Sequence, residues 1–259
     1  VVNICDRYGW EVVPFPEETQ LALDTIQKYN FNDEFTRTKI YKCMFPYQRE
    51  GVRMAICRFN GKCLIGDEMG LGKTLQAISI FKYYKLSKLV VVCPAYLRYT
   101  WYYEFKKWID DIDPIMIKKG SDSLHRGWPI IISYDLASKK VEELKKMQVE
   151  MVICDESHYL KSHTTKRTKA LTPLVCKAKK VVFLSGTPAL NRPIELYSQA
   201  HMLHPTIFPS FRKYAVRYCN GQMSPLGFFD SSGSSCPYEM KWICRKMFMI
   251  RRLKRDVLT

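Results

Sequence analysis

The sequence lacks the cysteine spacings that would indicate a disulfide framework or a zinc site. Ten cysteines occur among 259 residues, yet none belongs to a C-x-x-C pair, and Cys93 and Cys154 lie inside apolar runs. His201 and His204 lie near each other without cysteines at ligand spacing. We therefore expect reduced, buried thiols in an intracellular protein.

Long apolar runs are also missing. The longest strongly apolar run, Leu89 to Cys93, is far too short to cross a bilayer, so we expect no membrane partner. The chain starts at Val1 without a signal-peptide pattern, which indicates a piece of a longer protein. No internal repeat or low-complexity tract is found.

Carboxylates are scarce relative to basic side chains. The 41 Lys and Arg outnumber the 25 Asp and Glu, which gives a net charge of +16. This excess predicts attraction to polyanions, although a soluble basic protein without such a partner would show it too. Hydrophobic residues make up 47% of the chain, enough for a substantial core.

Short β-branched runs alternate with helical patterns from Phe45 onward. This alternation predicts an α/β fold, a parallel sheet flanked by helices on both faces, with sites at the carboxyl ends of the strands. Residues 201–259 predict a mostly helical C-terminal extension. Residues 1–40, with a helix-like stretch at 17–30, predict an appendage or linker before a domain at 41–259. The expected strands span 62–66, 88–93, 129–133, 150–154 and 179–184, and the expected helices span 73–84, 97–109 and 135–147.

Residues 66–74 read GDEMGLGKT, after an apolar strand and before a helix. A phosphate-binding loop usually reads G-x-x-x-x-G-K-[ST]; Gly72, Lys73 and Thr74 match its end, but Asp67 stands where the first glycine belongs. The strand–loop–helix context favours a phosphate loop over an accidental glycine-rich turn. Backbone amides and the helix start would cradle the phosphates of ATP, Lys73 would reach the β- and γ-phosphates, and Thr74 would hold Mg²⁺.

Residues 150–158 read EMVICDESH, in which an apolar strand delivers two adjacent carboxylates at its end. Successive strand residues point to opposite sides, so the two can act differently. Asp155 would organise Mg²⁺, and Glu156 would orient and deprotonate the attacking water. Alone the pair would be a solvated loop; a phosphate loop about 80 residues upstream makes it a Walker-B candidate. The predicted catalytic residues are Lys73, Asp155 and Glu156.

Two further segments gain a functional interpretation from the phosphate loop at 66–74. LSGTP at 184–188 follows an apolar strand, and the hydroxyls of Ser185 and Thr187 would sense nucleotide state, although the triplet alone is an ordinary turn. In FPYQREGV at 45–52, Gln48 can present a donor and an acceptor to an adenine edge. The expected ATP-binding residues are Gln48, Met69, Gly70, Leu71, Gly72, Lys73, Thr74 and Leu75.

The order of these segments resembles the first RecA-like lobe of superfamily-two helicases, and more narrowly that of Swi/Snf-type DNA translocases. That family's phosphate loop typically reads DEMGLGKT, so Asp67 follows its pattern. The resemblance covers about residues 45–259 and implies a P-loop NTPase lobe that uses ATP and Mg²⁺. Three more segments carry it: VVVCPAYLRYTW (90–101), SGTPALNRPIELY (185–197) and IRRLKRDVL (250–258).

Within this family the chain is most similar to the annealing-helicase branch, the HARP-type and Ran-binding-zinc-finger-type enzymes. The resemblance implies a nuclear DNA-dependent ATPase that remodels or anneals branched or double-stranded DNA in replication-fork repair. A HARP-like module can precede the motor, and RYGWEVVPF (7–15) resembles its tail. Gly66 stands where the family usually has Ala, and Arg192 replaces a frequent second Asn after Asn191. The segments that carry the likeness are FPYQREGV, DESHYLKS, GTPALNRPIELY and FRKYAVRYCN.

The resemblance also implies a second RecA-like lobe, which we expect to be absent because no second set of alternating strands follows residue 200. That lobe carries arginine fingers worth roughly 10³–10⁵ in rate, so we expect the chain alone to bind ATP weakly and hardly turn it over. RRLKR (251–255) is more typical of the brace leading into that lobe than of a nuclear import signal. By resemblance, the motor is monomeric, and its coupling residues are His158, Ser185 and Thr187.

A DNA-binding face is expected beside the ATP site. Residues 161–180 carry seven Lys or Arg and no carboxylate, which suits phosphate contacts and equally a solvated helix face. The helix 97–109 presents an aromatic stripe that could stack on bases, but a core face is favoured. By resemblance, four residues lie near the DNA-tracking face: Arg98, Trp101, Lys161 and Asn191.

Three alternatives to this function stay open. Another Swi/Snf-type branch would remodel chromatin. An RNA helicase is disfavoured by the MGLGKT loop and the RRLKRDV segment. A non-hydrolysing, nucleotide-gated DNA-binding module is disfavoured because it would not need both Lys73 and Glu156.

Overall fold

A parallel seven-stranded sheet forms the centre of the protein. The computed structural model describes residues 20, 29–187, 192–225 and 227–258. The strand order is β3-β4-β2-β5-β6-β1-β9, and every neighbouring pair is parallel, as the alternating sequence predicts. A separate antiparallel hairpin, β7-β8, lies outside this sheet. The sheet strands are β1 (Lys62–Ile65), β2 (Leu89–Cys93), β3 (Ile115–Met116), β4 (Ile130–Ser133), β5 (Met151–Cys154), β6 (Lys180–Leu184) and β9 (Met249–Ile250), and the hairpin strands are β7 (Gln222–Met223) and β8 (Phe229–Asp230).

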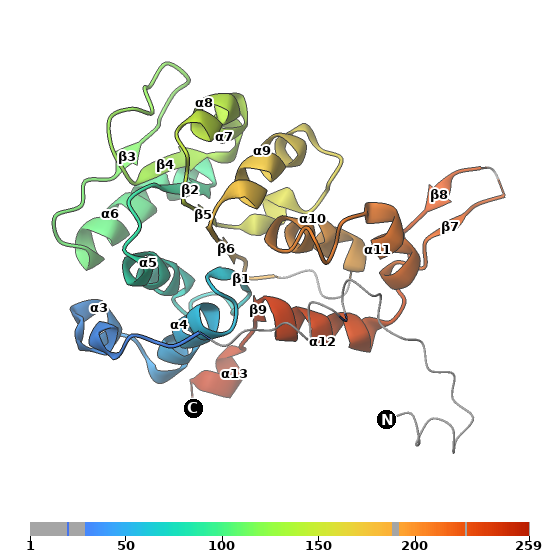
Figure 1. Cartoon of the computed structure of the whole chain (residues 1–259), viewed down its shortest axis with the longest axis horizontal. Coiled ribbons are helices and arrows are strands. Elements are labelled where there is room, and N and C mark those ends of the chain that lie inside the picture. The colour runs from blue at the N-terminus through green and yellow to red at the C-terminus, as the bar shows by residue number, and fades with distance from the viewer. Residues whose placement is uncertain (1–19, 21–28, 188–191, 226, 259) are drawn as a thin grey trace.

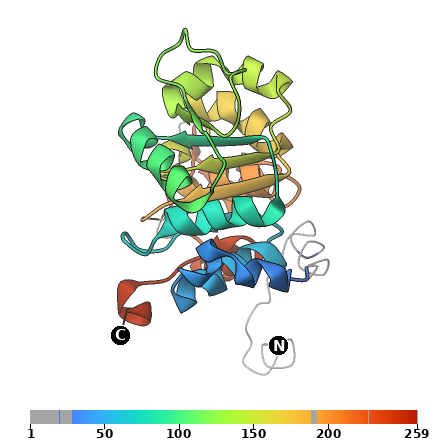
Figure 2. The same ribbon diagram turned by 90° about the vertical axis from the view of Figure 1, so that its left-hand side faces the viewer.

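Helices cover both faces of the sheet (Figures 1 and 2). On one face α4, α5 and α6 pack with α3, and on the other face lie α7 to α12. The α-helices are α3 (Lys39–Lys42), α4 (Pro46–Cys57), α5 (Lys73–Tyr84), α6 (Arg98–Trp108), α7 (Tyr134–Lys139), α8 (Val141–Lys146), α9 (Lys166–Lys177), α10 (Pro193–Leu203), α11 (Phe211–Tyr218), α12 (Pro237–Met247) and α13 (Lys254–Val257). The 3₁₀-helices are η1 (Asp33–Arg37), η2 (Ala95–Leu97) and η3 (Ser157–Leu160).

Alternating side chains of the central strands build two separate cores. In β2, Val90 and Val92 join the cluster on the α7–α12 face, whereas Leu89, Val91 and Cys93 join the cluster on the α4–α6 face. Because strand side chains alternate, a strand buried on both faces must be apolar at every position. This explains why each central strand is a continuous apolar run in the sequence.

The expected strands and helices match the structure closely, with two kinds of difference. The expected helix 135–147 is split into α7 and α8 at Lys140. The edge strands β3 and β9 have only two residues each, which is too short a run to show a pattern. The region after residue 200 is mostly helical, as expected, but it returns β9 to the sheet beside β1.

The N-terminal expectations fall mostly outside the described residues. The RYGWEVVPF segment and nearly all of the helix-like stretch lie there. The first described elements, η1 and α3, bury Phe35 and Ile40 against the α4–α6 core. The domain division after residue 40 therefore stays a prediction.

The thiols in the described part of the chain are all free. Burial raises the pKa of Cys93 to about 12, so this strand thiol stays protonated at neutral pH. Within the same described ranges, no helix has the length and apolar character that a bilayer crossing demands.

Candidate nucleotide site

Three polar loops meet where the central strands β5, β6 and β1 end. These strands are neighbours in the sheet and all run in the same direction. Their carboxyl ends therefore bring together residues 66–72 after β1, Asp155 and Glu156 after β5, and Ser185 to Thr187 after β6. Segments more than 100 residues apart in the chain thus form one site.

The loop after β1 has the backbone of an anion-binding turn. Gly70 and Gly72 adopt positive φ angles of 86° and 71°, a conformation that other residues rarely take. A Cβ on Gly72 would also clash with the Gln48 amide. The next residue, Lys73, begins the 12-residue helix α5, whose first amides have no partners within the helix. Glycine freedom and a helix start therefore combine to leave amide donors for an anion.

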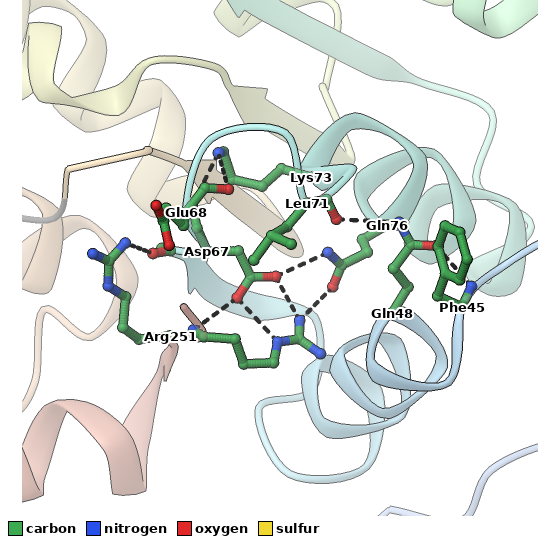
Figure 3. A network of polar contacts seen from close by, with 10 residues as sticks. Phe45, Gln48, Asp67, Glu68, Leu71, Lys73, Gln76 and Arg251 are labelled. Carbon is green, nitrogen blue, oxygen red and sulfur yellow. Dashed lines mark hydrogen bonds and ion pairs between the residues drawn. The ribbon is translucent and has the colours of Figure 1, made fainter. Parts of the chain in front are cut away.

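Lys73 is held inside this loop. Its Nζ donates to the carbonyl oxygens of Asp67 at 2.9 Å and Glu68 at 3.4 Å (Figure 3). Burial lowers the pKa of the Lys73 ammonium, and the nearby carboxylates of Glu156, Asp67 and Asp155 oppose that shift. The ammonium is thus placed where added phosphate charge would replace weak carbonyl contacts with stronger ones.

Asp155 is buried at the end of β5 and is held by two donors. The Nε1 of Trp101 lies 2.9 Å from Oδ2, and the backbone amide of Glu156 lies 2.8 Å from Oδ1. The Tyr134 hydroxyl donates to the Asp155 carbonyl at 2.8 Å. Burial raises the pKa of this carboxyl, whereas the Trp101 hydrogen bond lowers it. The carboxylate is therefore fixed in place at the end of β5.

Glu156 has a different environment from its neighbour. Its backbone is left-handed, with φ 47°, which is unusual for a residue with a long side chain. Its side chain is 25% exposed and lies 3.2 Å from Nδ1 of His158. The adjacent carboxylates therefore differ in environment: Asp155 is buried, and solvent can reach Glu156.

The donors present fit a nucleotide with a hard cation. The loop offers backbone amides and a lysine, and the oxygens of Thr74 and Asp155 are the type that Mg²⁺ prefers. Burial raises the pKa of the Asp155 carboxyl, and a cation bound beside it would favour the charged form. The side chain of Leu71 is fully buried and that of Met69 is 65% exposed, so these two positions serve the loop mainly through their backbone.

Gln48 lies against the loop rather than on an open surface. Its side chain is 4% exposed, its Nε2 donates to the Leu71 carbonyl at 3.1 Å, and its Oε1 accepts from the Phe45 amide at 2.9 Å (Figure 3). These two bonds use one N–H and one lone pair of the Gln48 amide. The structure places Gln48 as a brace of the loop, a contact that the sequence did not reveal.

The segment after β6 touches the phosphate loop. A Cβ on Gly186 would lie 2.7 Å from Cγ of Met69 and 3.8 Å from Nζ of Lys73. Ser185 is buried and its Oγ accepts from the Thr187 amide at 3.3 Å, while Thr187 is exposed. The predicted coupling residues therefore border the nucleotide site.

A buried hydrogen bond links the DESH segment to α10. The Ser157 hydroxyl donates to Oε1 of Gln199 at 3.0 Å, and both side chains are buried. His158, in contrast, is exposed, and its ring contacts the Glu156 carboxylate and the Tyr159 ring. Ser157 and Gln199 were not predicted; their spacing of 42 residues gives no local signal in the sequence.

The four predicted nucleic-acid residues have unlike positions. Trp101 is 1% exposed in the core, so the predicted DNA contact is corrected here to a support for Asp155, and the core alternative for the aromatic stripe holds at this position. The Arg98 guanidinium donates to the carbonyls of Ile117 at 2.5 Å and Lys118 at 3.3 Å. Lys161 is 51% exposed and pairs with Glu195. Asn191 lies outside the described residues.

Comparisons with known proteins agree with this geometry. A model of the SNF2-related domain matches residues 47–259. The cattle SWI/SNF-related matrix-associated actin-dependent regulator of chromatin subfamily A-like protein 1 is 43% identical over 226 residues, which is 86% of this chain and 24% of that protein. The mouse DNA annealing helicase and endonuclease ZRANB3 is 37% identical over 259 residues, covering 95% of this chain and 24% of that protein.

Solved structures show the same fold. The Sulfolobus solfataricus SWI2/SNF2 ATPase core in complex with dsDNA superposes with a TM-score of 0.68 at 25% identity, over 83% of this chain and 46% of that chain. The present chain spans about a quarter of the length of the curated relatives it matches. The family match runs through all three strand-end loops of the site, and the chain belongs to the SNF2-related domain family.

Proposed function

We propose that the protein is the ATP-binding lobe of a DNA-dependent ATPase that moves on DNA and remodels or anneals branched or double-stranded DNA. The observation that carries this proposal is the convergence of the Lys73 loop, the Asp155–Glu156 pair and the Ser185–Thr187 segment at one sheet edge. Two relatives support the DNA part, since one is named a DNA annealing helicase and another is solved in complex with dsDNA.

The loop residues bind the nucleotide in this proposal. Amides of residues 69–75 and the Lys73 ammonium hold the phosphates, and Gln48 holds the loop and offers its remaining amide groups to adenine. Thr74 and Asp155 would hold Mg²⁺, which neutralises phosphate charge when bound. Trp101 and the Glu156 amide keep the Asp155 carboxylate oriented for that task.

Glu156 acts as the base. It is the carboxylate of the pair that solvent reaches, so it can orient a water and accept its proton. Ser185 and Thr187 flank Gly186, which lies beside the phosphate loop, and His158 contacts Glu156. We assign these three residues the transmission of nucleotide state to the rest of the motor.

The remaining partners follow from the family. DNA phosphates would lie along the basic residues 161–180, and a second RecA-like lobe in a longer chain would complete the site with arginine side chains. We assign the parent protein to the nucleus as a monomeric motor. Without the second lobe, residues 41–259 should bind ATP and turn it over slowly.

The test measures the ATPase rate of a chain that includes a second lobe. Forked DNA, duplex DNA, single strands, nucleosomes and RNA are compared with no nucleic acid at equal salt. Stimulation that is largest with forked DNA supports the proposal. Preference for nucleosomes would favour chromatin remodelling, preference for RNA would favour an RNA helicase, and nucleotide binding without turnover would favour a gated binding module; each contradicts the proposal.

A further inference from the structure

Asp67, which stands at the first-glycine position of the loop, is fully buried and carries an acidic side chain. A buried carboxylate is costly unless charged and hydrogen-bonding partners surround it. Gln76 on α5 donates to its Oδ2 at 3.0 Å. The other three donors all belong to one distant residue, Arg252, through its backbone amide at 3.1 Å, Nε at 3.0 Å and Nη2 at 2.6 Å.

Arg252 reaches this carboxylate through space that a glycine leaves free. A Cβ on Gly51, in the middle of α4, would clash with the Arg252 guanidinium and with the Gln76 side chain. The Arg252 Nη2 also donates to Oε1 of Gln76 at 2.8 Å. One guanidinium therefore joins α4, α5, the loop and the C-terminal segment.

The backbone after β9 continues alongside the loop. The Gly66 amide donates to the Ile250 carbonyl at 2.7 Å, and the Glu68 amide donates to the Arg252 carbonyl at 3.0 Å. The Lys254 amide donates to the Glu68 carboxylate at 2.7 Å. The β1–β9 pairing thus extends beyond both strands, so residues 66–68 cannot shift without moving residues 250–254.

A second arginine ties the same segment to the β6 loop. Nη1 of Arg251 donates to the carbonyls of Gly66 and, at 3.1 Å, of Gly186. Gly186 lies beside Lys73, as described above. Consecutive arginines therefore hold the two loops on either side of the Lys73 ammonium.

We propose that Arg252 is a positioning residue for the phosphate loop. Its guanidinium fixes the Asp67 side chain, and the Asp67 carbonyl in turn holds Lys73 Nζ, so the shape of the loop before nucleotide arrives depends on the C-terminal segment. By linkage, a nucleotide that draws Lys73 away from this carbonyl changes how tightly residues 251–254 are held. The inference rests on the proposed function only in that the ligand is a nucleotide.

The first test uses hydrogen exchange of the 259-residue chain without nucleotide. Arg252→Gln should speed exchange of the amides of residues 67–72, and Asp67→Asn should do the same. In Arg255→Gln, exchange should be unchanged, because Arg255 is 82% exposed and pairs only with Asp256 among the described residues. Unchanged loop exchange in Arg252→Gln would overturn the proposal, even if that variant melts at a lower temperature.

The second test measures the affinity of the same variants for a non-hydrolysable ATP analogue with Mg²⁺. Loss of a charge-assisted bidentate contact should weaken binding by about tenfold or more. The double variant should bind about as weakly as either single variant, because both remove one contact. Additive losses would overturn the proposal.

A milder variant covers the case in which Arg252→Gln does not fold. Gly51→Ala leaves every charge in place and displaces the guanidinium by sterics alone, so it should reproduce the faster loop exchange. If the wild-type 259-residue chain binds no nucleotide while Arg252→Gln still speeds loop exchange, the proposed function fails and the positioning role stands. If the wild-type chain binds the analogue and neither Arg252→Gln nor Gly51→Ala changes loop exchange, the positioning role alone fails.

Discussion

The candidate nucleotide site lies at the carboxyl ends of β1, β5 and β6, here called the nucleotide edge. This region and the basic segment 161–180 use charge in opposite ways. At the nucleotide edge, Asp67 and Asp155 are buried, and each is held by donors from distant parts of the chain. In the basic segment, Lys179 is exposed and pairs with Glu150, while the half-buried Arg167 pairs with the exposed carboxylate of Asp135. Buried, oriented charges mark a built site, whereas exposed pairs contribute little energy.

The two regions therefore differ in how closely they specify a ligand. Near the nucleotide site, hydrogen bonds hold the side chains of Gln48, Lys73 and Asp155 in place. The basic segment offers a surface of one sign, which attracts polyanions without specifying one. We therefore expect substitutions at the nucleotide edge to have large effects, and substitutions in the basic segment to have small, salt-sensitive effects.

The largest effect is expected at Glu156. Replacing it with Gln keeps the size of the side chain but removes the base, so turnover in a chain with a second lobe should fall by about 10²–10⁴. ATP binding should stay within a few-fold, because the loop amides and Lys73 are intact. Glu142→Gln, at a 76% exposed site far from the loop, is the control. Retained turnover would remove Glu156 from its assigned role.

An intermediate effect is expected at Trp101. Trp101→Phe removes the indole N–H that donates to the buried Asp155 carboxylate, and this should cost about 1–3 kcal/mol of stability. Since that hydrogen bond lowers a pKa that burial raises, its loss should raise the pKa of Asp155 further. The ionised form then exists only at higher pH, so more Mg²⁺ should be needed at acidic pH.

Trp108→Phe is the matched control for this change. Trp108 lies on the same helix, and its Nε1 donates to the Glu104 carboxylate at 2.8 Å, away from the nucleotide edge. Thermal unfolding and the Mg²⁺ concentration for half-maximal activity are the measurements. If Trp101→Phe and Trp108→Phe shift the Mg²⁺ requirement equally, Trp101 does not support Asp155.

The smallest effect is expected at Lys161. If its ammonium contacts a DNA phosphate, Lys161→Ala should reduce the slope of log affinity against log salt by about 1. Lys179 directly precedes β6, at the amino end of that strand, so Lys179→Ala should leave the slope unchanged. Equal slopes for both variants would place DNA elsewhere on the lobe.

The sequence predicts the central fold and the nucleotide loops because their signals are local. A strand such as β2, buried on both faces, must be apolar throughout, and the loop after β1 needs glycines with positive φ angles. Both features are visible in a few consecutive residues. The strand-end positions of Lys73, Asp155 and Ser185 then follow from the common direction of parallel strands.

The rest of the site depends on contacts between distant residues. Arg252 lies 185 positions after Asp67, and Trp101 lies 54 positions before Asp155, so no local pattern connects either pair. Trp101 also shows why a helical aromatic stripe is ambiguous: its ring belongs to the core while its Nε1 supports the site. Short edge strands such as β9 are set by pairing with β1 rather than by their own sequence.

Nucleotide binding by the 259-residue chain tests the central claim most directly. A non-hydrolysable ATP analogue with Mg²⁺ is titrated into the wild-type chain and into Lys73→Ala, with Lys82→Ala on the last turn of α5 as control. The account predicts saturable binding to the wild type and the control, and a loss of about tenfold or more for Lys73→Ala. Equal affinity of Lys73→Ala and the wild type, or no binding at all, would contradict a nucleotide site at this edge.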